Sequence, residues 1–151
     1  MTRISTPIPS PRSAADTAIR ACLTVPCRPE QVRVVREFIR QVFRDDPDAD
    51  IPVLLTSELA TNSVLYSWSR LGGTMMVTVS DIEDGMVRVE VADAGGLSVP
   101  VPQDENDDWA ESGHGLRLVR DLSDQMSYRI EADGGLVTWF VIPSCGRDAD
   151  R

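Results

Sequence analysis

Alternating apolar residues in two neighbouring segments constrain the fold of this chain more than any other feature of its sequence. Apolar side chains recur at every second position from Met75 to Val79, and again from Val87 to Val91. A period of two is the spacing of side chains on one face of a β-strand. Turn-forming residues fill the segment from Asp81 to Gly85 between them. The sequence therefore predicts a β-hairpin with one buried face.

Strand and helix periods continue on both sides of this hairpin. The predicted elements are a strand over 19–25, a helix over about 29–44, a second helix from Pro52 to about Trp68 with Asp50 as candidate N-cap, a third helix from about Gly115, and a hairpin of 127–132 with 136–142. The order β-α-α-β-β-α-β-β predicts an α+β fold. We expect a two-layer sandwich in which three helices pack on one face of a mixed, mostly antiparallel sheet.

The chain has 151 residues, which suits one domain with a sizeable core. We expect that domain over residues 19–143, with a flexible N-terminal tail over 1–18 and a C-terminal tail over 144–151. Residues 97–112 are acidic and aperiodic, which predicts a long loop. Loops of that length in compact domains are usually functional.

Charge and composition exclude several classes of function. The 15 basic residues are outnumbered by 24 acidic ones, giving a net charge of −9 that repels phosphate backbones and predicts no direct binding to nucleic acid. Every basic residue is an arginine, and the absence of lysine excludes Walker-A phosphate binding and Schiff-base chemistry. The single histidine, His114, excludes metal sites that need several.

Cysteine usage and hydropathy indicate where such a chain resides. Cys22, Cys27 and Cys145 form no C-x-x-C pair and are odd in number, which is typical of reduced thiols in the cytoplasm. No apolar run reaches the length of a signal peptide or the about 18 residues of a membrane span. We expect a cytoplasmic protein that does not enter a membrane.

Two polar residues interrupt the apolar pattern of the second predicted helix. The apolar arc is formed by Leu54, Leu55, Leu59 and Leu65, and Thr56, Ser63 and Ser67 lie opposite it. Glu58 and Asn62, one helical turn apart, fall within the arc, where an unsatisfied carboxylate or amide is costly. Either both side chains face a cavity that holds a ligand, or a rotation of the helix lets them reach solvent.

Asp93 raises a similar question at the end of a strand. Strict alternation places it on the same buried face as the valines of 87–91, and Ala94-Gly95-Gly96 follows. Asp93 is then either an ordinary turn residue or a buried acceptor for a ligand.

A glycine pair stands directly before the third predicted helix, in Gly113-His114-Gly115-Leu116. Glycines at this place let backbone N–H groups approach a phosphate at the positive end of a helix. A dinucleotide-binding loop would need a third glycine where Leu118 stands and a strand directly before it, so that reading is excluded. His114 between two glycines is more typical of an exposed spacer than of a catalyst.

The order of these features resembles the N, G1 and G2 boxes of the GHKL ATPases, which include gyrase, heat-shock chaperone and sensor-kinase ATP domains. The matching segments are Glu58-Leu-Ala-Thr-Asn62, Asp93-Ala-Gly95 and Gly113-His-Gly115-Leu116. The longer segments Ser57–Asn62 and Gly113–Asp124, with the closing Gly134-Gly135-Leu-Val-Thr-Trp139-Phe140, look most similar to bacterial anti-sigma-factor serine/threonine kinases and their free-standing ATP-binding relatives. The likeness covers about residues 20–143 and implies a Bergerat-type sandwich.

The resemblance implies ATP and Mg²⁺ as ligands. Asn62 would coordinate the Mg²⁺ that bridges the phosphates, and Glu58 would be the general base. Asp93 would accept from the adenine amine, and Gly95 would leave room for the base. The implied phosphate-wrapping residues are Gly113, His114, Gly115 and Leu116, with 97–112 as the ATP lid. No lysine is required, because Mg²⁺ and backbone dipoles can carry the phosphate charge.

The chain departs from the family pattern at three places. Tyr66 stands where the family usually has histidine, Leu97 where it has the second G1 glycine, and Val137 where it often has threonine, with Thr138 one position away.

Two functions follow from the resemblance. The first is a serine/threonine kinase that sequesters a sigma factor and phosphorylates an anti-anti-sigma protein of the STAS type, for which Glu58 argues. The second is a non-catalytic binding module that switches partners, for which Tyr66 and Leu97 argue. The family likeness makes a homodimer plausible in either case.

Overall fold

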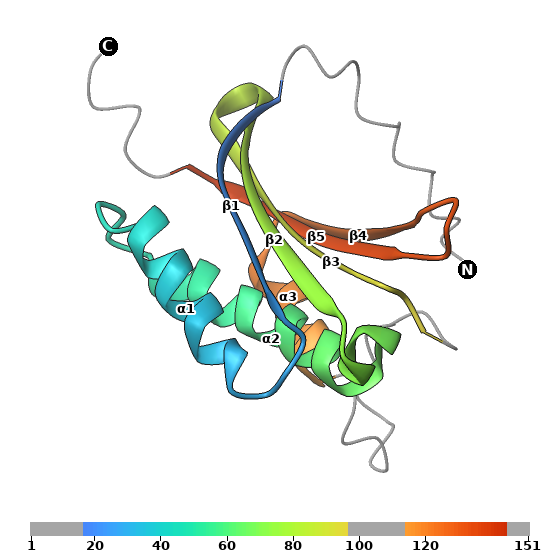
Figure 1. Ribbon diagram of the computed structural model, residues 1–151. Helices are drawn as coiled ribbons and strands as arrows, with labels where there is room; N and C mark the ends of the chain where they lie inside the picture. Colours follow the sequence, from blue (N-terminus) through green and yellow to red (C-terminus); the bar gives the residue numbers. More distant parts are fainter. Residues whose placement is uncertain (1–16, 97–113, 145–151) are drawn as a thin grey trace.

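Two layers make up the protein in this computed structural model, which describes residues 17–96 and 114–144, with only the backbone of His114. A twisted five-stranded sheet forms one layer, and three helices cover one of its faces (Figure 1). The predicted two-layer α+β sandwich and its element order are confirmed. The expected tails and the loop over 97–112 lie, but for a few residues, outside the described part.

The strands are β1 (Ala18–Pro26), β2 (Thr74–Ile82), β3 (Met86–Asp93), β4 (Gln125–Ile130) and β5 (Leu136–Pro143). Their order across the sheet is β1-β2-β3-β5-β4, and all four pairings are antiparallel, where the sequence predicts a mixed, mostly antiparallel sheet. Strands that are neighbours in the sheet also follow one another along the chain, except for β3 and β5. Helix α3 and β4 lie between β3 and β5 in the chain.

The predicted central hairpin is β2 and β3, joined by the short helix η3 (Glu83–Gly85). Val77 pairs with Val91, and Val79 with Val89. All four side chains are at least 98% buried and belong to the core between sheet and helices. Burying a valine side chain contributes about 1.5–3 kcal/mol, so this row is a principal source of stability.

The helices are α1 (Gln31–Val42), α2 (Asp50–Tyr66) and α3 (His114–Leu122), and a short helix η2 (Trp68–Leu71) follows α2. The prediction of Asp50 as N-cap is wrong. Ala49 holds that position with helical φ and ψ, and no side chain caps the helix. The helix therefore begins before Pro52, whose missing N–H is tolerated in a first turn.

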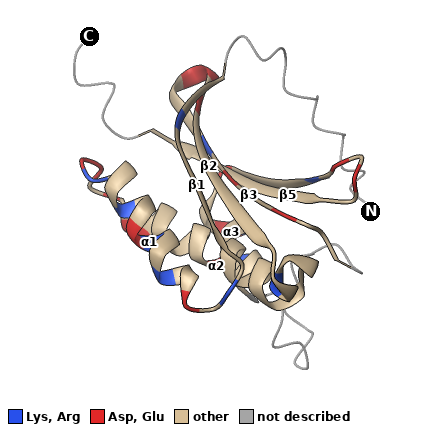
Figure 2. Ribbon diagram, viewed as in Figure 1, with Lys and Arg blue, Asp and Glu red and all other residues tan. Residues whose placement is uncertain are grey.

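The predicted orientation of α2 is also wrong in part. Leu54 and Leu65, expected in the buried arc, are 39% and 55% exposed, whereas Thr56 and Ser63, expected opposite, are 0% and 4% exposed. The helix is mostly uncharged and packs against α1, α3 and the sheet (Figure 2). With neighbours on several sides, small hydroxyl side chains fit the buried positions, and Thr56 donates to the Pro52 carbonyl at 2.7 Å.

None of the helices in the described segments combines the length and apolar character that a membrane crossing requires.

Candidate functional site

Asp93, the last residue of β3, lies on the helix-facing side of the sheet as the alternation predicts. Its Oδ1 accepts from the Gly95 N–H at 2.7 Å, and its Oδ2 accepts from the Ser63 hydroxyl of α2 at 2.6 Å. The first bond is that of an ordinary Asx turn. The second joins the carboxylate to a buried hydroxyl of α2. The turn is therefore confirmed, and the role of Asp93 as an acceptor for a ligand stays a prediction.

Gly95 must be glycine because of its backbone conformation and because the turn between β4 and β5 packs against it. Its φ is +75°, and a Cβ there would collide with the Gly134 carbonyl of the β4–β5 turn. The close approach of these two backbones is what the structure shows at Gly95.

Glu58 and Asn62 lie one turn apart on α2, and both side chains are partly buried. The Glu58 carboxylate has no hydrogen bond or ion pair among the described residues. The Asn62 Nδ2 is buried and has no partner in the same part of the chain. A buried polar group without a partner costs about 1–3 kcal/mol, so the Asn62 Nδ2, which finds no partner among the described residues, is a candidate for contact with a ligand.

The beginning of α3 lies directly against Glu58. A Cβ added to Gly115, the second residue of that helix, would collide with Glu58 Oε2. With glycine here the helix N-terminus and the carboxylate can meet, whereas a larger residue would make the end of the Glu58 side chain move away. The first N–H groups of α3 have no partner within the helix, and they form the positive end of its dipole.

Asp93, Asn62, Glu58 and the start of α3 form a row along α2, which we call the site row. Glu58 lies about 7.5 Å from Ser63 along the helix axis, at 1.5 Å per residue. The Asp93 carboxylate, bonded to Ser63, therefore marks one end of this row along α2, and Glu58 with the start of α3 marks the other, with Asn62 at a position between Glu58 and Ser63. Such a row could recognise an extended molecule by an acceptor at one end and by a helix N-terminus at the other.

Cys27, which follows β1, is a neighbour of this site that sequence reasoning missed. Its side chain is 2% exposed, and burial, followed by the charge of Asp93, raises the pKa of the thiol. Neither cause has a local sequence signal, because both depend on parts of the chain that are far from Cys27 in the sequence.

The remaining predicted residues are only partly described. Leu116 is 2% exposed and its side chain belongs to the core, so only its backbone is available to a ligand. Gly113, the His114 side chain and Leu97 lie outside the described residues. Tyr66, at the end of α2, is 45% exposed.

The family model of the histidine kinase-like ATPase domain matches residues 25–142. The chain belongs to this family. No curated protein sequence matches it.

Two solved structures share this fold of the histidine kinase-like ATPase domain. One contains the RsbU and RsbW domains of Rv1364c from Mycobacterium tuberculosis, with 18% identity and a TM-score of 0.59 over 82% of this chain and 32% of that one. The other is the SiaB–SiaC complex from Pseudomonas aeruginosa, with 15% identity and a TM-score of 0.60 over 82% of this chain and 89% of the other. This chain thus spans about a third of the Rv1364c structure. At these identities the likeness establishes the fold.

The donor set of this histidine kinase-like ATPase domain suits a hydrated divalent cation better than a protein-built metal cage. No group of three or more His, Cys, Asp or Glu side chains that could hold a metal occurs within 17–96 and 114–144. Mg²⁺ is usually bound through one or two protein oxygens together with phosphates and waters. The amide oxygen of Asn62 is a donor of the kind that this mode uses, and the two ends of an asparagine amide are assigned from their hydrogen bonds, of which Nδ2 has none among the described residues.

Proposed function

We propose that this protein binds Mg²⁺–ATP and is a serine/threonine kinase of the anti-sigma-factor type. The observation that carries the proposal is the carboxylate of Glu58, which has no partner among the described residues and lies one turn from Asn62 and against the first turn of α3. A carboxylate without a partner, beside a helix N-terminus that attracts phosphate, is suited to activate a hydroxyl.

Each group in the row has one role in the proposed binding mode. Asp93 accepts a hydrogen bond from the adenine amine, which guanine lacks at that position. Asn62 would hold Mg²⁺, and the N–H groups at the start of α3 would bind phosphate oxygens. Bound Mg²⁺ would supply electrostatic neutralisation of the phosphate charge.

Glu58 is the proposed general base. It takes the proton of a serine or threonine hydroxyl on the partner protein while the hydroxyl oxygen forms a bond to the γ-phosphorus. The bond from that phosphorus to the bridging oxygen breaks, and ADP leaves. Little covalent chemistry falls to the protein in such a reaction, because position and charge provide most of the catalysis.

The proposed partners are a sigma factor, which the protein sequesters, and a STAS-type antagonist, which it phosphorylates. A similar fold occurs in the RsbW domain of Rv1364c and in the SiaB–SiaC structure. The acidic surface, with a net charge of −9, suits protein partners better than nucleic acid.

A non-catalytic partner-switching module is the second candidate. Tyr66 favours it, since this exposed side chain stands where the family usually has histidine. In that case the site row would bind nucleotide, or would remain as part of the fold, without phosphotransfer.

One experiment separates the two candidates. The purified chain is titrated with ATP in the presence and absence of MgCl₂ by calorimetry, and is then incubated with γ-labelled ATP and a panel of STAS-type proteins from the source genome. A kinase labels one of them on serine or threonine. Binding of ATP without transfer to any panel member supports the module. Absence of ATP binding contradicts the kinase and leaves only a module that does not use nucleotide.

A further inference from the structure

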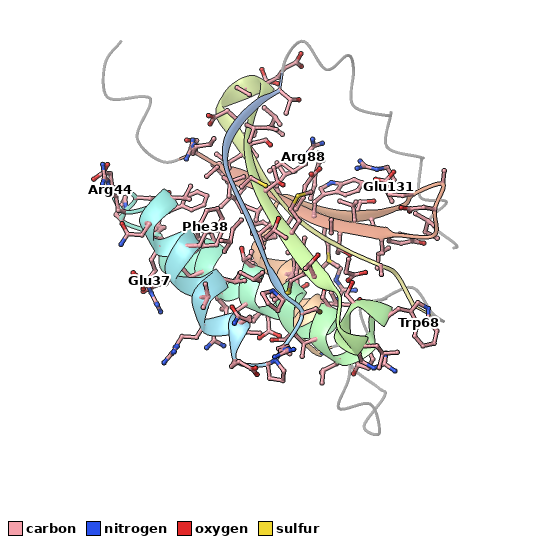
Figure 3. All side chains as sticks on the ribbon, in the orientation of Figure 1. Glu37, Phe38, Arg44, Trp68, Arg88 and Glu131 are labelled. Carbon is pink, nitrogen blue, oxygen red and sulfur yellow. The ribbon has the colours of Figure 1, made fainter. Side chains whose placement is uncertain are left out.

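The loop that follows β3 is fastened to the end of α2 and to η2 by side chains from three serines. Ser63 donates to Asp93, and Ser69 Oγ accepts from the Ala94 N–H at 2.8 Å. Ser67 Oγ accepts from the Ser69 N–H at 2.8 Å and so holds η2 in place. The Trp68 N–H donates to the Gly95 carbonyl at 2.7 Å, and Figure 3 shows Trp68 near the end of β3.

Ser63 differs from every other serine and threonine of α2. Thr56, Ser57 and Thr61 donate to carbonyls three or four residues earlier in the same helix, at 2.7, 3.0 and 2.7 Å. This is the usual bond of a serine or threonine inside a helix. Ser63 instead donates to a side chain 30 positions away in the sequence. An ionised carboxylate is a stronger acceptor than a backbone carbonyl, which explains why the Ser63 hydroxyl donates to Asp93.

The chemistry of the two groups fixes the direction of this bond. An ionised carboxylate can only accept, so the Ser63 hydroxyl must donate. Each Asp93 oxygen then accepts one hydrogen bond, one from Ser63 and one from Gly95. A carboxylate has about four acceptor positions, so each oxygen keeps one for a ligand, while the two bonds hold the group in one orientation.

We propose that Ser63 is the positioning residue for base selection: it holds the Asp93 carboxylate so that its remaining acceptor positions select a 6-amino purine over a 6-oxo purine. This inference rests on the proposed nucleotide function. Ser63 itself is 4% exposed and acts through Asp93. Without it, the carboxylate turns about its side-chain bonds, and its preference for an amine donor at one fixed place is weakened.

The test compares three nucleoside triphosphates on the full chain. ATP carries the 6-amino group, GTP carries a 6-oxo group, and purine riboside triphosphate carries neither. Binding of each is measured by calorimetry with MgCl₂ for the wild type and for Ser63→Ala. The matched control is Ser57→Ala, which removes another buried hydroxyl from the same helix but one that bonds only to its own helix.

For Ser63→Ala we expect about a tenfold loss of ATP affinity, which corresponds to about 1.4 kcal/mol. The affinities for GTP and purine riboside triphosphate should change less than about twofold, an effect under about 0.5 kcal/mol. Ser57→Ala should leave all three unchanged. If Ser63→Ala does not fold, Ser63→Cys keeps the volume with a weaker donor and should show the same selective loss.

The inference is overturned if Ser63→Ala weakens all three nucleotides equally, since the serine would then only support the structure. It is also overturned if the ratio of ATP to GTP affinity does not change. These results are distinct from failure of the proposed function, which appears as absence of ATP binding in the wild type.

Discussion

The two ends of the site row differ in how completely the chain satisfies its own polar groups. At Asp93 both carboxylate oxygens accept hydrogen bonds, and the following loop is fastened to α2 and η2. At Glu58 the carboxylate has no partner among the described residues, and the neighbouring Asn62 Nδ2 is buried without one. The first end is preorganised, which reduces the cost of binding. The second end keeps polar groups that no other residue within 17–96 and 114–144 satisfies.

This difference assigns specificity to one end and chemistry to the other. A group that is already hydrogen-bonded can discriminate between ligands, because its orientation is fixed before they arrive. A group without a partner can take up a proton or turn towards a cation. Substitutions at the two ends should therefore separate selectivity from turnover, and four predictions test this.

The largest expected effect is that of Glu58→Gln on phosphotransfer. Glutamine keeps the size of the side chain and removes its basicity, so the rate should fall about 10²- to 10⁴-fold. ATP affinity should stay nearly normal, because a general base acts mainly in the transition state. Single-turnover transfer to the partner and calorimetry measure the two quantities.

Glu37→Gln is the matched control, since Glu37 is an exposed acid on α1, away from the row (Figure 3). Full phosphotransfer by Glu58→Gln would show that Glu58 is not the base.

The next effect in size is that of Asp93→Ala on ATP binding. Loss of a hydrogen bond to a charged group costs about 1.5–3 kcal/mol, so ATP affinity should fall about 10- to 150-fold. GTP affinity should change far less. Asp133→Ala is a close control, because Asp133 accepts from the Gly135 N–H at 2.8 Å in the same kind of turn but is exposed. Equal losses for ATP and GTP would remove the adenine role of Asp93.

The sequence predicted the elements of this site better than their connections. Periodicity placed Asp93 on the helix side of β3, and the interruption of the apolar pattern pointed to Glu58 and Asn62. The periodicity of α2 is wrong for Ser63: it predicts the side opposite the apolar arc, but Ser63 is only 4% exposed. A helix with neighbours on several sides buries small hydroxyl residues as readily as leucines, so an apolar arc does not define its buried face.

The bond from Ser63 to Asp93 could not be predicted from any local pattern. It joins a helix to the end of a strand, and it depends on how the sheet lies against α2. The contact of Gly115 with Glu58 is similar: the glycines before α3 predict a phosphate loop, and nothing in that local pattern indicates that a side chain of α2 lies against Gly115. Local signals predicted the elements and tertiary packing decided which residues meet.

A third prediction concerns Asn62, whose replacement should weaken nucleotide binding without destabilising the free protein. Asn62→Ala should lower ATP affinity in MgCl₂ by about tenfold, or 1.4 kcal/mol, and should reduce the gain in affinity that MgCl₂ provides. Without nucleotide, the free energy of unfolding should not fall, because the substitution removes a buried donor that has no partner. Calorimetry and thermal unfolding measure both effects. A clear destabilisation of the free protein would show that the amide is satisfied in some other way.

The smallest effect concerns the thiol of Cys27, which reports on the preorganised end. Burial, and after it the charge of Asp93, raises the pKa of Cys27. The folded chain therefore keeps this proton at a pH where the unfolded chain has lost it, so stability should fall as the pH rises above the ordinary cysteine range. In a chain with Cys22→Ser and Cys145→Ser, the rate of alkylation by iodoacetamide against pH should rise later than for an ordinary thiol. Asp93→Ala should move that rise to lower pH but not to the ordinary value, because burial is the larger cause. If the rise does not move, the charge of Asp93 does not affect the Cys27 thiol. Asp93 would then be joined to its surroundings by its hydrogen bonds but would not influence this neighbouring group.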